Sequence, residues 1–350
     1  MAPKRILLSS YRFHPSIGGQ ETSSLFLAKG FVERGHQVTV VTATPGDTHG
    51  YPYKVVREPS AGELYRLVRD ADIVWQNHIA LRHLWPLALL SRPLVFMHHI
   101  SLRMLGDVKP HLGNLKRFVS RMGRNVFVSK ALRDESALPG DIVPNSYDEK
   151  TFRVIPGIER DRDLVFVGRL RRYKGADLLV DAVADLAAQG IEAKTTVVGL
   201  GKEADALKAQ AAEKGLAKLI DFPGPQTGEE LARILNRHKI LVIPSRCEEA
   251  FGIVGLEALA CGCVVVAADS GGLPEVLGPA AKIFPKENSR SLAAILKTLL
   301  TDQRALDDVR RNIPAQLAKY DKSMILDACE RVIDEATRAS PSGTVGMARN

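Results

Sequence analysis

Short apolar runs rich in β-branched residues alternate along this chain with longer stretches whose apolar residues recur at helical spacing. Between the first two runs, residues 20–34 carry apolar side chains at Leu25, Ala28 and Val32, and Gly35 follows as a helix-ending glycine. This alternation is typical of parallel sheets built from strand–helix–strand units. The strands predicted in the first half span residues 5–10, 37–42, 54–57, 73–76, 94–98, 125–128 and 141–143.

The same alternation restarts after residues 148–163, which follow neither period and are typical of a linker. We therefore predict an α/β protein with two doubly wound, Rossmann-like domains at residues 1–155 and 156–320. A helix at 321–338 is expected to pack back toward the first domain, and the tail at 339–350 is expected to be disordered. The second domain has predicted strands at 164–168, 194–198, 219–222, 240–244 and 264–267, and helices at 176–189, 203–214, 228–237, 252–260 and 289–301.

The composition, with 45% hydrophobic and 25% charged residues, is that of an ordinary globular protein. Its apolar stretches are far shorter than the roughly 20 residues that cross a bilayer, and the N-terminus shows no secretory signal. Four cysteines in 350 residues do not make a disulfide framework, so we expect a cytoplasmic protein. Cys247, Cys261 and Cys263 fit no zinc spacing, and we interpret them as small buried residues.

The net charge of +8 is unevenly placed. Lys and Arg outnumber Asp and Glu by 21 to 13 in residues 1–155, and the two classes balance at 27 each in the remainder. The first half is therefore expected to face something anionic. A phosphorylated or lipid-linked acceptor and a membrane surface are favoured over nucleic acid.

Ligands of open α/β sheets bind beyond the carboxyl ends of the strands, where three segments stand out. The first is Gly18-Gly19, which leads into the first helix and suits a pyrophosphate through backbone amides and the helix N-terminus. It is not the dinucleotide glycine fingerprint, and a plain turn into a helix remains the alternative. The second follows the strand at 164–168, where Arg169 and Lys174 can grip phosphate oxygens, with a solvated basic loop as the alternative.

The third segment follows the strand at 240–244 and carries two carboxylates, Glu249 in a loop and Glu257 on the following helix. Eight residues of helix span about 12 Å, comparable with the distance from a nucleotide's ribose to the sugar beyond its pyrophosphate. One carboxylate can therefore accept hydrogen bonds from ribose hydroxyls while the other lies near the sugar. We expect the base near Gly224 and Pro225, beyond another strand of the same domain.

The sequence Glu249-Ala250-Phe251-Gly252 with Glu257 resembles the glutamate pair of retaining glycosyltransferases of family four, which have the GT-B fold of two Rossmann-like domains facing a cleft. Further segments follow in family order at 18–21, 72–78, 128–129, 143–146, 168–170, 174–175, 198–201 and 271–275. The resemblance implies transfer of a sugar, with retention, from a nucleotide-diphosphate donor to a hydroxyl of an unidentified acceptor. UDP-sugar is the first choice of donor and GDP-sugar the second.

The same resemblance implies a role for each matching residue. Arg169 and Lys174 with Gly18 and Gly19 would hold the diphosphate, and Glu257 the ribose. Glu249 would hold the sugar, together with the backbone amides of Ala250, Phe251, Gly252 and Ile253. Neither a metal nor another cofactor is expected, because cationic side chains and helix ends neutralise the leaving group.

A histidine near the donor sugar is also implied. His99 follows the strand at 94–98 and is the first choice, with His98 as the fallback. A histidine that is simply hydrogen-bonded at a strand end is the alternative for His99, and the preferred interpretation for His78.

Residues 112–127 combine apolar and basic side chains and could form an amphipathic helix that docks on anionic lipid at the inner face of a membrane. A domain helix with a solvated cationic face is the alternative. The segment runs from Leu112 to Phe127, with apolar residues at Leu115, Phe118, Val119 and Met122 and basic residues at Lys116, Arg117, Arg121 and Arg124.

Other classes share parts of this pattern. A GT-B epimerase or phosphorylase would not predict the two glutamates together with Arg169 and Lys174. A non-catalytic nucleotide-binding scaffold would leave Glu249 dispensable. A dinucleotide oxidoreductase lacks its glycine fingerprint in both halves.

Overall fold

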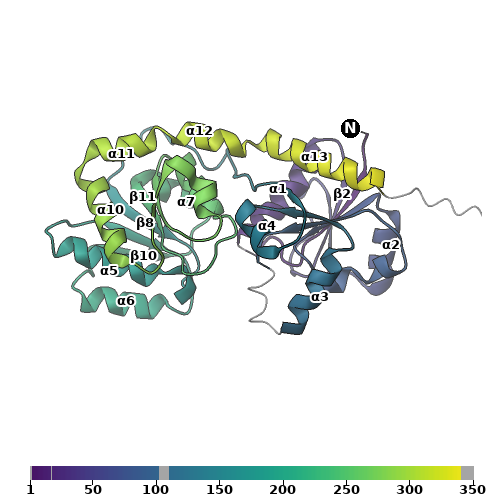
Figure 1. The fold of residues 1–350 in the computed structure, drawn as a ribbon, viewed down its shortest axis with the longest axis horizontal. Coiled ribbons are helices and arrows are strands. Elements are labelled where there is room, and N and C mark those ends of the chain that lie inside the picture. The colour runs from purple at the N-terminus through teal and green to yellow at the C-terminus, as the bar shows by residue number, and fades with distance from the viewer. Residues whose placement is uncertain (1, 17, 102–109, 340–350) are drawn as a thin grey trace, which may run out of the picture. The chain divides into compact units, whose positions relative to one another are not determined.

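The computed structural model describes residues 2–16, 18–101 and 110–339, which form two compact units (Figure 1). Unit 1 comprises Met1–Asn145 and Lys322–Asn350, and unit 2 comprises Ser146–Asp321. Each unit is built on one parallel sheet, so the two doubly wound sheets predicted from the sequence are confirmed. All but the first residue of the predicted tail lies outside the described residues.

The units divide after Asn145, whereas the sequence predicts the boundary at residue 155. The predicted linker belongs to unit 2 because it is hydrogen-bonded there. The amide of Ile155 donates to Asn236 Oδ1 at 2.8 Å, and Asn236 Nδ2 donates to the carbonyl of Arg153 at 2.9 Å. The segment without a regular period is therefore a loop that packs on unit 2, and not a linker between the units.

Unit 1 contains a seven-stranded sheet in the order β3-β2-β1-β4-β5-β6-β7. Strands β4 and β5 are buried along their whole length, which explains their continuous apolar runs. The strands are β1 Arg5–Ser9, β2 Gln37–Thr42, β3 Lys54–Arg57, β4 Ile73–Asn77, β5 Leu94–His98, β6 Arg124–Phe127 and β7 Asp141–Ile142. The helices are α1 Gly19–Glu33, α2 Ala61–Asp70, η1 Leu81–His83, η2 Trp85–Ala88, α3 Pro110–Ser120, α4 Lys130–Ser136 and α13 Lys322–Ala339.

Helix α13 returns to unit 1 from the far end of the chain and lies along α1 (Figure 1). Gly30 of α1 allows this approach, because a Cβ there would come within 2.4 Å of Leu326. Arg34 adds ion pairs to Asp327 at 2.6 Å and to Glu330 at 3.4 Å. The C-terminal helix thus completes the core of unit 1.

The predicted amphipathic segment at 112–127 is only partly helical. Helix α3 ends at Ser120, and Arg124–Phe127 is strand β6, paired with β5. Gly123 lies against β5, where a Cβ would come within 2.7 Å of the Leu94 carbonyl oxygen. The expectation of a helix over the whole of 112–127 is therefore wrong, because the chain turns at Gly123 to enter the sheet, whereas the strand predicted at 125–128 is confirmed as β6.

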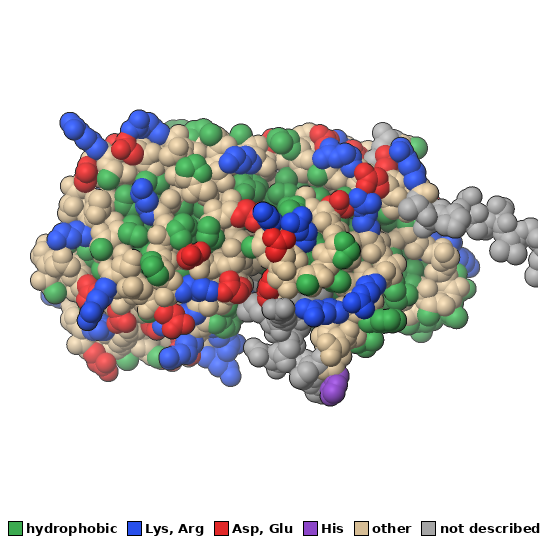
Figure 2. Space-filling model, in the orientation of Figure 1, with side chains coloured by type: hydrophobic (Ala, Val, Ile, Leu, Met, Phe, Trp, Pro, Cys, Tyr) green, Lys and Arg blue, Asp and Glu red, His purple; other side chains and the backbone are tan. Residues whose placement is uncertain are grey.

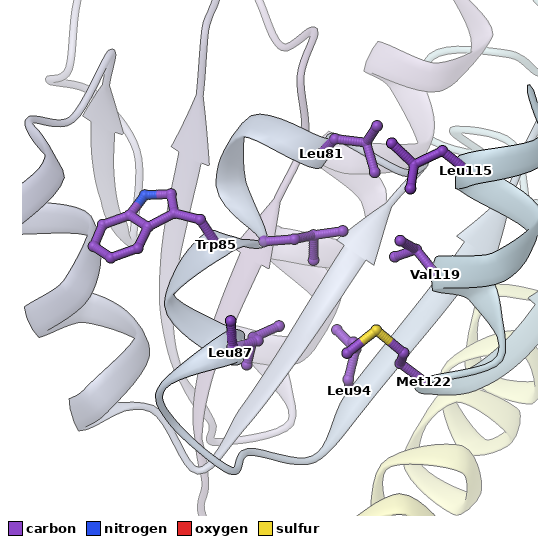
Figure 3. A pocket seen from close by; sticks show the side chains of 9 residues that line it. Leu81, Trp85, Leu87, Leu94, Leu115, Val119 and Met122 are labelled. Carbon is purple, nitrogen blue, oxygen red and sulfur yellow. The ribbon is translucent and has the colours of Figure 1, made fainter. Parts of the chain in front are cut away.

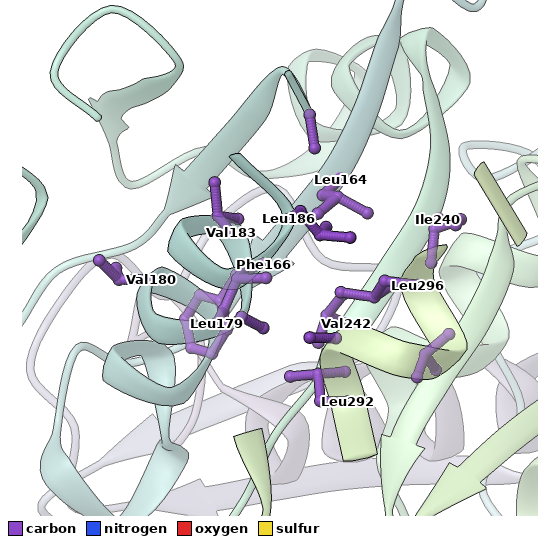
Figure 4. Packing of buried hydrophobic residues seen from close by; sticks show 14 of the residues in the cluster. Leu164, Phe166, Leu179, Val180, Val183, Leu186, Ile240, Val242, Leu292 and Leu296 are labelled. Carbon is purple, nitrogen blue, oxygen red and sulfur yellow. The ribbon is translucent and has the colours of Figure 1, made fainter. Parts of the chain in front are cut away.

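Unit 2 contains a six-stranded sheet in the order β10-β9-β8-β11-β12-β13. One apolar cluster joins the sheet to helices α5, α6, α10 and α11, with Phe166, Leu179, Val242 and Leu296 among its buried members (Figure 4). The strands are β8 Arg162–Val167, β9 Thr195–Val198, β10 Ile220–Gly224, β11 His238–Ile243, β12 Val264–Ala268 and β13 Ala281–Phe284. The helices are η4 Arg172–Lys174, α5 Ala176–Ala187, α6 Ala204–Glu213, α7 Gly228–Arg237, α8 Ile253–Ala260, α9 Leu273–Leu277, η5 Gly278–Ala280, α10 Ser289–Thr301, α11 Gln303–Arg310, α12 Ile313–Leu317 and η6 Ala318–Tyr320.

Candidate active site

Each sheet reverses its strand order at one point. In unit 2 the chain leaves β8 for β9 and β10 and then returns to form β11 on the other side of β8. In unit 1 the same reversal lies between β1 and β4. Loops diverge beyond the strand ends at such a switch point and leave a crevice for ligands. In unit 2 these loops carry Arg169, Lys174 and Glu249.

The loop after β8 packs tightly on the loop after β11 through Gly175. This residue has a φ of 72°, and a Cβ on it would lie 1.9 Å from the carbonyl oxygen of Pro244. Only glycine combines this backbone conformation with so close an approach. The sequence Lys174-Gly175 therefore fixes the lysine beside the end of β11.

An ion pair that the sequence did not indicate joins the same two loops. Arg246 Nη1 and Nη2 each donate to Asp177 at 2.7 Å, and the Arg246 amide donates to the carbonyl of Tyr173 at 2.9 Å. Burial acts to raise the pKa of Asp177, but the hydrogen bonds and charge of Arg246 outweigh it and hold that pKa below its usual range. The pair holds the two loops at a fixed spacing.

Lys174 and Glu249 are in direct contact. Lys174 Nζ donates to Glu249 Oε1 at 2.5 Å, and Ser245 Oγ donates to the same oxygen at 2.5 Å. Charge-assisted hydrogen bonds of this kind fix the orientation of a carboxylate. The structure thus brings together two predicted site residues and adds Ser245, whose only sequence signal was its place directly after a strand.

Arg169 is exposed beside this cluster, with its guanidinium carbon 5.8 Å from the centre of the Tyr173 ring. In the described part of the chain no carboxylate forms an ion pair with it. A guanidinium placed next to a lysine at a strand end can receive a diphosphate bidentately.

The backbone of Glu249 is braced by the loop after β12. Gly272 donates its amide to the Glu249 carbonyl at 2.7 Å, and a Cβ on Gly271 would come within 2.3 Å of that oxygen. Ser270 Oγ donates to the carbonyl of Cys247 in the same loop. The segment at 271–275 therefore supports the position of Glu249.

Helix α8 begins directly after this loop. Gly252 precedes it with a φ of 83°, and Phe251 is buried against Tyr320 with ring centres 5.6 Å apart. Ala250, Phe251, Gly252 and Ile253 lie around the N-terminus of this helix, whose partial positive charge favours a negatively charged group of a ligand.

Glu257 lies on the second turn of α8 and is 8% exposed. Burial, with a smaller contribution from the charge of Asp148, raises its pKa to about 7. No salt bridge to Glu257 occurs within the described ranges. A buried carboxylate without a cationic partner is suited to accepting hydrogen bonds from neutral hydroxyl groups.

Gly224 and Pro225 lie at the end of β10, which is separated from β8 by β9. Gly224 has a φ of 82° and nothing within 4 Å of an added Cβ, so its surroundings are open. These residues are on the same edge of the sheet as Arg169.

In unit 1, His99 follows β5 within a buried polar cluster. Its Nε2 lies 2.6 Å from Asn77 Oδ1 and 3.5 Å from Ser23 Oγ, and Asn77 Nδ2 donates to Ser24 Oγ at 2.6 Å. Burial, with a smaller effect of His98, lowers the pKa of His99 to about 3. The ring is therefore neutral near pH 7, with Nε2 donating to Asn77 and Nδ1 left as an acceptor.

The fallback histidine has a different environment. His98 Nε2 lies 2.9 Å from Asn125 Oδ1, and its ring stacks on Phe127 with centres 4.6 Å apart. These contacts fasten β5 to β6. Of the two histidines, His99 is the one that lies beside the N-terminal part of α1, next to Ser23, and near the switch point between β1 and β4.

Gly18 and Gly19 lie at the start of α1. A Cβ on Gly18 would come within 2.6 Å of Glu21 Oε2, whereas nothing lies within 4 Å of one on Gly19. The Glu21 side chain is buried in the first helical turn, where its negative charge competes with a bound anion. The geometry thus favours a phosphate at Arg169 and Lys174 over one at this helix end.

Among the described residues no three or more His, Cys, Asp or Glu side chains gather as metal ligands. Cys261 and Cys263 are buried, and Cys247 is partly buried; burial raises the pKa of each thiol.

Two doubly wound units, one with a cation–carboxylate cluster at its switch point, have the architecture of open α/β proteins that bind ligands beyond the strand ends. The family model described as "Glycosyl transferases group 1" matches residues 148–316, and that described as "Glycosyltransferase Family 4" matches residues 17–146. The chain belongs to this family of glycosyltransferase enzymes, and its fold is GT-B, as the sequence predicted.

Two relatives illustrate the range of similarity. The phosphatidyl-myo-inositol mannosyltransferase of Mycolicibacterium smegmatis is 27% identical over 95% of this chain and 94% of its own length. The D-inositol 3-phosphate glycosyltransferase of Corynebacterium jeikeium is 31% identical over 53% of this chain. The match spans 46% of the length of the Corynebacterium enzyme.

Solved structures show the same fold. Sucrose-phosphate synthase from Thermosynechococcus elongatus superposes with a TM-score of 0.80 at 19% identity, over 96% of this chain and 100% of its own. The Anabaena protein HepE, in complex with UDP and glucose, also gives 0.80 at 20% identity, over 95% of this chain and 100% of its own.

Proposed function

We propose that the chain transfers a sugar from a nucleotide-diphosphate donor to a hydroxyl of an acceptor, with retention of anomeric configuration and without a metal or other cofactor. The observation that carries the proposal is the contact of Lys174 and Ser245 with Glu249 Oε1, beside Arg169. Two cations next to an oriented carboxylate suit a donor with a diphosphate at one end and a sugar at the other.

In the proposed reaction the bond between the sugar's anomeric carbon and the phosphate oxygen breaks, and the acceptor oxygen bonds to that carbon on the same face. The departing phosphate oxygen takes the acceptor's proton. Arg169 and Lys174 stabilise the negative charge that develops on this oxygen. Glu249 and His99 are proposed to accept hydrogen bonds from sugar hydroxyls, and Glu257 from the ribose.

UDP-sugar is the first choice of donor and GDP-sugar the second, with the base beside Gly224 and Pro225. The HepE structure contains UDP and glucose, which supports the first choice. The chain is similar to a D-inositol 3-phosphate glycosyltransferase and a phosphatidyl-myo-inositol mannosyltransferase, so we propose an anionic or lipid-linked polyol as the acceptor class.

Peripheral contact with the inner face of a membrane is part of the proposal. Leu115, Phe118 and Met122 of α3 and its following turn are exposed, as are Trp85 and Leu89. An apolar pocket of about 290 Å³ lies between η1, η2 and α3, lined by Leu81, Leu87, Leu94, Val119 and others (Figure 3). Lys and Arg side chains accompany apolar ones in this region (Figure 2). Such a surface suits anionic lipid.

Cosedimentation with vesicles tests the membrane contact. We expect binding to phosphatidylglycerol vesicles, and its loss when Phe118 and Met122 are both changed to Ser. Leu200→Ser, an exposed leucine of unit 2, is the matched control. Equal sedimentation of wild-type protein with neutral and anionic vesicles would remove this part of the proposal. No described helix is long and apolar enough to span a bilayer.

The catalytic proposal is tested by Glu249→Gln, which keeps the shape of the side chain and removes its charge. We expect turnover of the sugar nucleotide to fall about 100-fold or more, the scale of a lost electrostatic contact to the transition state. Affinity for the nucleoside diphosphate alone should stay within about twofold, because Glu249 is assigned to the sugar. Glu248→Gln, at an exposed ion pair with Lys286, is the control. Undiminished turnover by Glu249→Gln would contradict the proposal.

A further inference from the structure

Helix α3 buries two polar residues, Lys116 and Ser120, and exposes apolar ones. Its buried positions are Gly113, Lys116 and Ser120, whereas Leu115 and Phe118 are 48% and 63% exposed. The spacing of three and four residues places the first three on one face of the helix. Lys116, at 9% exposure, therefore points inward from α3.

The Lys116 ammonium has no anionic partner. Within residues 2–16, 18–101 and 110–339 no carboxylate forms an ion pair with it, and its Nζ donates no hydrogen bond. Burial lowers the pKa of Lys116. A buried cation without a partner is unfavourable, and a ligand of opposite charge would remove that penalty.

Helix α3 packs beside the segment that follows His78, since Leu115 and Val119 line one pocket with Leu81 and Leu84 (Figure 3). After burial, the charge of Lys116 is the next cause of the lowered pKa of His78. His78 directly follows β4, has a φ of 74° and is 8% exposed. Its Nδ1 is buried without a hydrogen-bond partner. A buried ring nitrogen without a hydrogen-bond partner and a backbone at positive φ both destabilise the folded protein. Their occurrence together at a strand end therefore suggests a functional role.

His78 lies with His99 at one edge of the sheet. His78 follows β4 and His99 follows β5, two neighbouring strands, and His99 also acts on the pKa of His78. Strand β4 borders the switch point of unit 1. The excess positive charge of the chain lies in the same half of the sequence.

We propose that Lys116 Nζ and His78 Nδ1 form a binding site for a phosphate group, which they hold next to His99. The neutral tautomer of His78 with a proton on Nδ1 supplies one donor, and the ammonium supplies the charge. The inference rests on the proposed function, because it makes this phosphate part of the acceptor. A soluble phosphorylated polyol and a phospholipid headgroup share that chemistry.

The test follows the imidazole carbon-bound proton signal of His78 by NMR during titration with sodium phosphate at constant ionic strength. His78→Gln assigns the signal. We expect a saturable shift in wild-type protein, and about tenfold weaker binding in Lys116→Met, the scale of one charge-assisted hydrogen bond. Lys29→Met, at an exposed lysine of α1, is the matched control and should titrate like wild type.

The design separates this site from the donor site. Arg169→Met should leave the His78 titration unchanged, and the experiment needs no transfer activity, so failure of the proposed function would not affect it. Glycerol 3-phosphate and dihexanoyl phosphatidylglycerol serve as further probes. Tighter binding of glycerol 3-phosphate would indicate a soluble phosphorylated polyol, and tighter binding of the lipid would indicate a phospholipid headgroup. A His78 signal that does not respond to phosphate, or that responds equally in Lys116→Met, would overturn the inference.

Discussion

Glu257 is the residue whose ionisation most directly links the fold to ligand binding. Burial raises its pKa from 4.5 to about 7, so between these values the folded protein holds a proton that the unfolded chain has lost. The free energy of unfolding should therefore fall by about 3 kcal/mol on this account as pH rises from 4.5 to 7. Urea denaturation of wild type and Glu257→Gln across this pH range isolates the contribution of Glu257 to the free energy of unfolding. A difference between the two that does not change with pH would contradict it.

The same residue should make nucleotide affinity depend on pH. Ribose hydroxyls donate to the ionised carboxylate, so binding of a nucleoside diphosphate should strengthen as pH rises toward and past 7. Glu257→Gln should weaken binding and remove this dependence. Titration calorimetry at several pH values measures both effects, and a parallel pH profile in the variant would exclude the assignment.

Single residues were predictable from the sequence where they directly follow strands. Arg169, Lys174 and Glu249 were found in this way, and the structure brings the last two into contact. Their pairing was not predictable, because it depends on the spacing that Gly175 and Arg246 set between two loops distant in sequence. Lys116 was hidden among the basic residues of one segment, since only the packing of α3 shows which of them is buried.

At the scale of elements, Gly175 links the loop after β8 to the end of β11. Gly175→Ala should destabilise the protein by more than about 2 kcal/mol, because the new Cβ would meet the Pro244 carbonyl at a positive φ. Gly190 has a φ of 80°, but nothing lies within 4 Å of an added Cβ. Gly190→Ala should therefore destabilise the protein by only about 1 kcal/mol. Denaturant unfolding compares them, and equal losses would show that the loop contact is unimportant.

The Arg246–Asp177 pair is expected to matter more than exposed pairs. Asp177→Asn should cost about 1–2 kcal/mol, which for a unit of this size lowers the thermal midpoint by about 2–4 °C per kcal/mol. It should also weaken donor binding, since the two loops lose their fixed spacing. Asp308→Asn, which breaks the exposed pair with Arg311, should change stability by less than about 1 kcal/mol. Equal effects of the two substitutions would contradict this role.

Long elements with a clear period were predictable. Residues 20–34 and 252–260 correspond to α1 Gly19–Glu33 and α8 Ile253–Ala260. The end of the helix within 112–127 was not predictable from periodicity, because the amphipathic pattern continues through Gly123, although the strand that follows was expected at 125–128 and is β6. Similarly, the residues tied to Asn236 have no periodicity that assigns them to unit 2.

For the molecule as a whole, α13 makes the stability of unit 1 depend on the far end of the chain. Leu326→Ala removes a buried side chain packed on Gly30 and should cost about 2–4 kcal/mol. Hydrogen exchange should show faster exchange in α1 as well as in α13. Arg331→Ala, at an exposed position of the same helix, is the control. Unchanged protection of α1 in Leu326→Ala would show that the helix is not part of that core.

The central claim is that the switch point of unit 2 binds a nucleoside diphosphate through its cations. Titration calorimetry with UDP and with GDP on wild type, Arg169→Met and Arg171→Met tests it most directly. Arg171 is exposed two residues along the same loop. We predict saturable binding of one nucleotide, weakened about tenfold or more in Arg169→Met and within about twofold of wild type in Arg171→Met. Absence of binding by either nucleotide, or equal weakening in the two variants, would contradict the assignment.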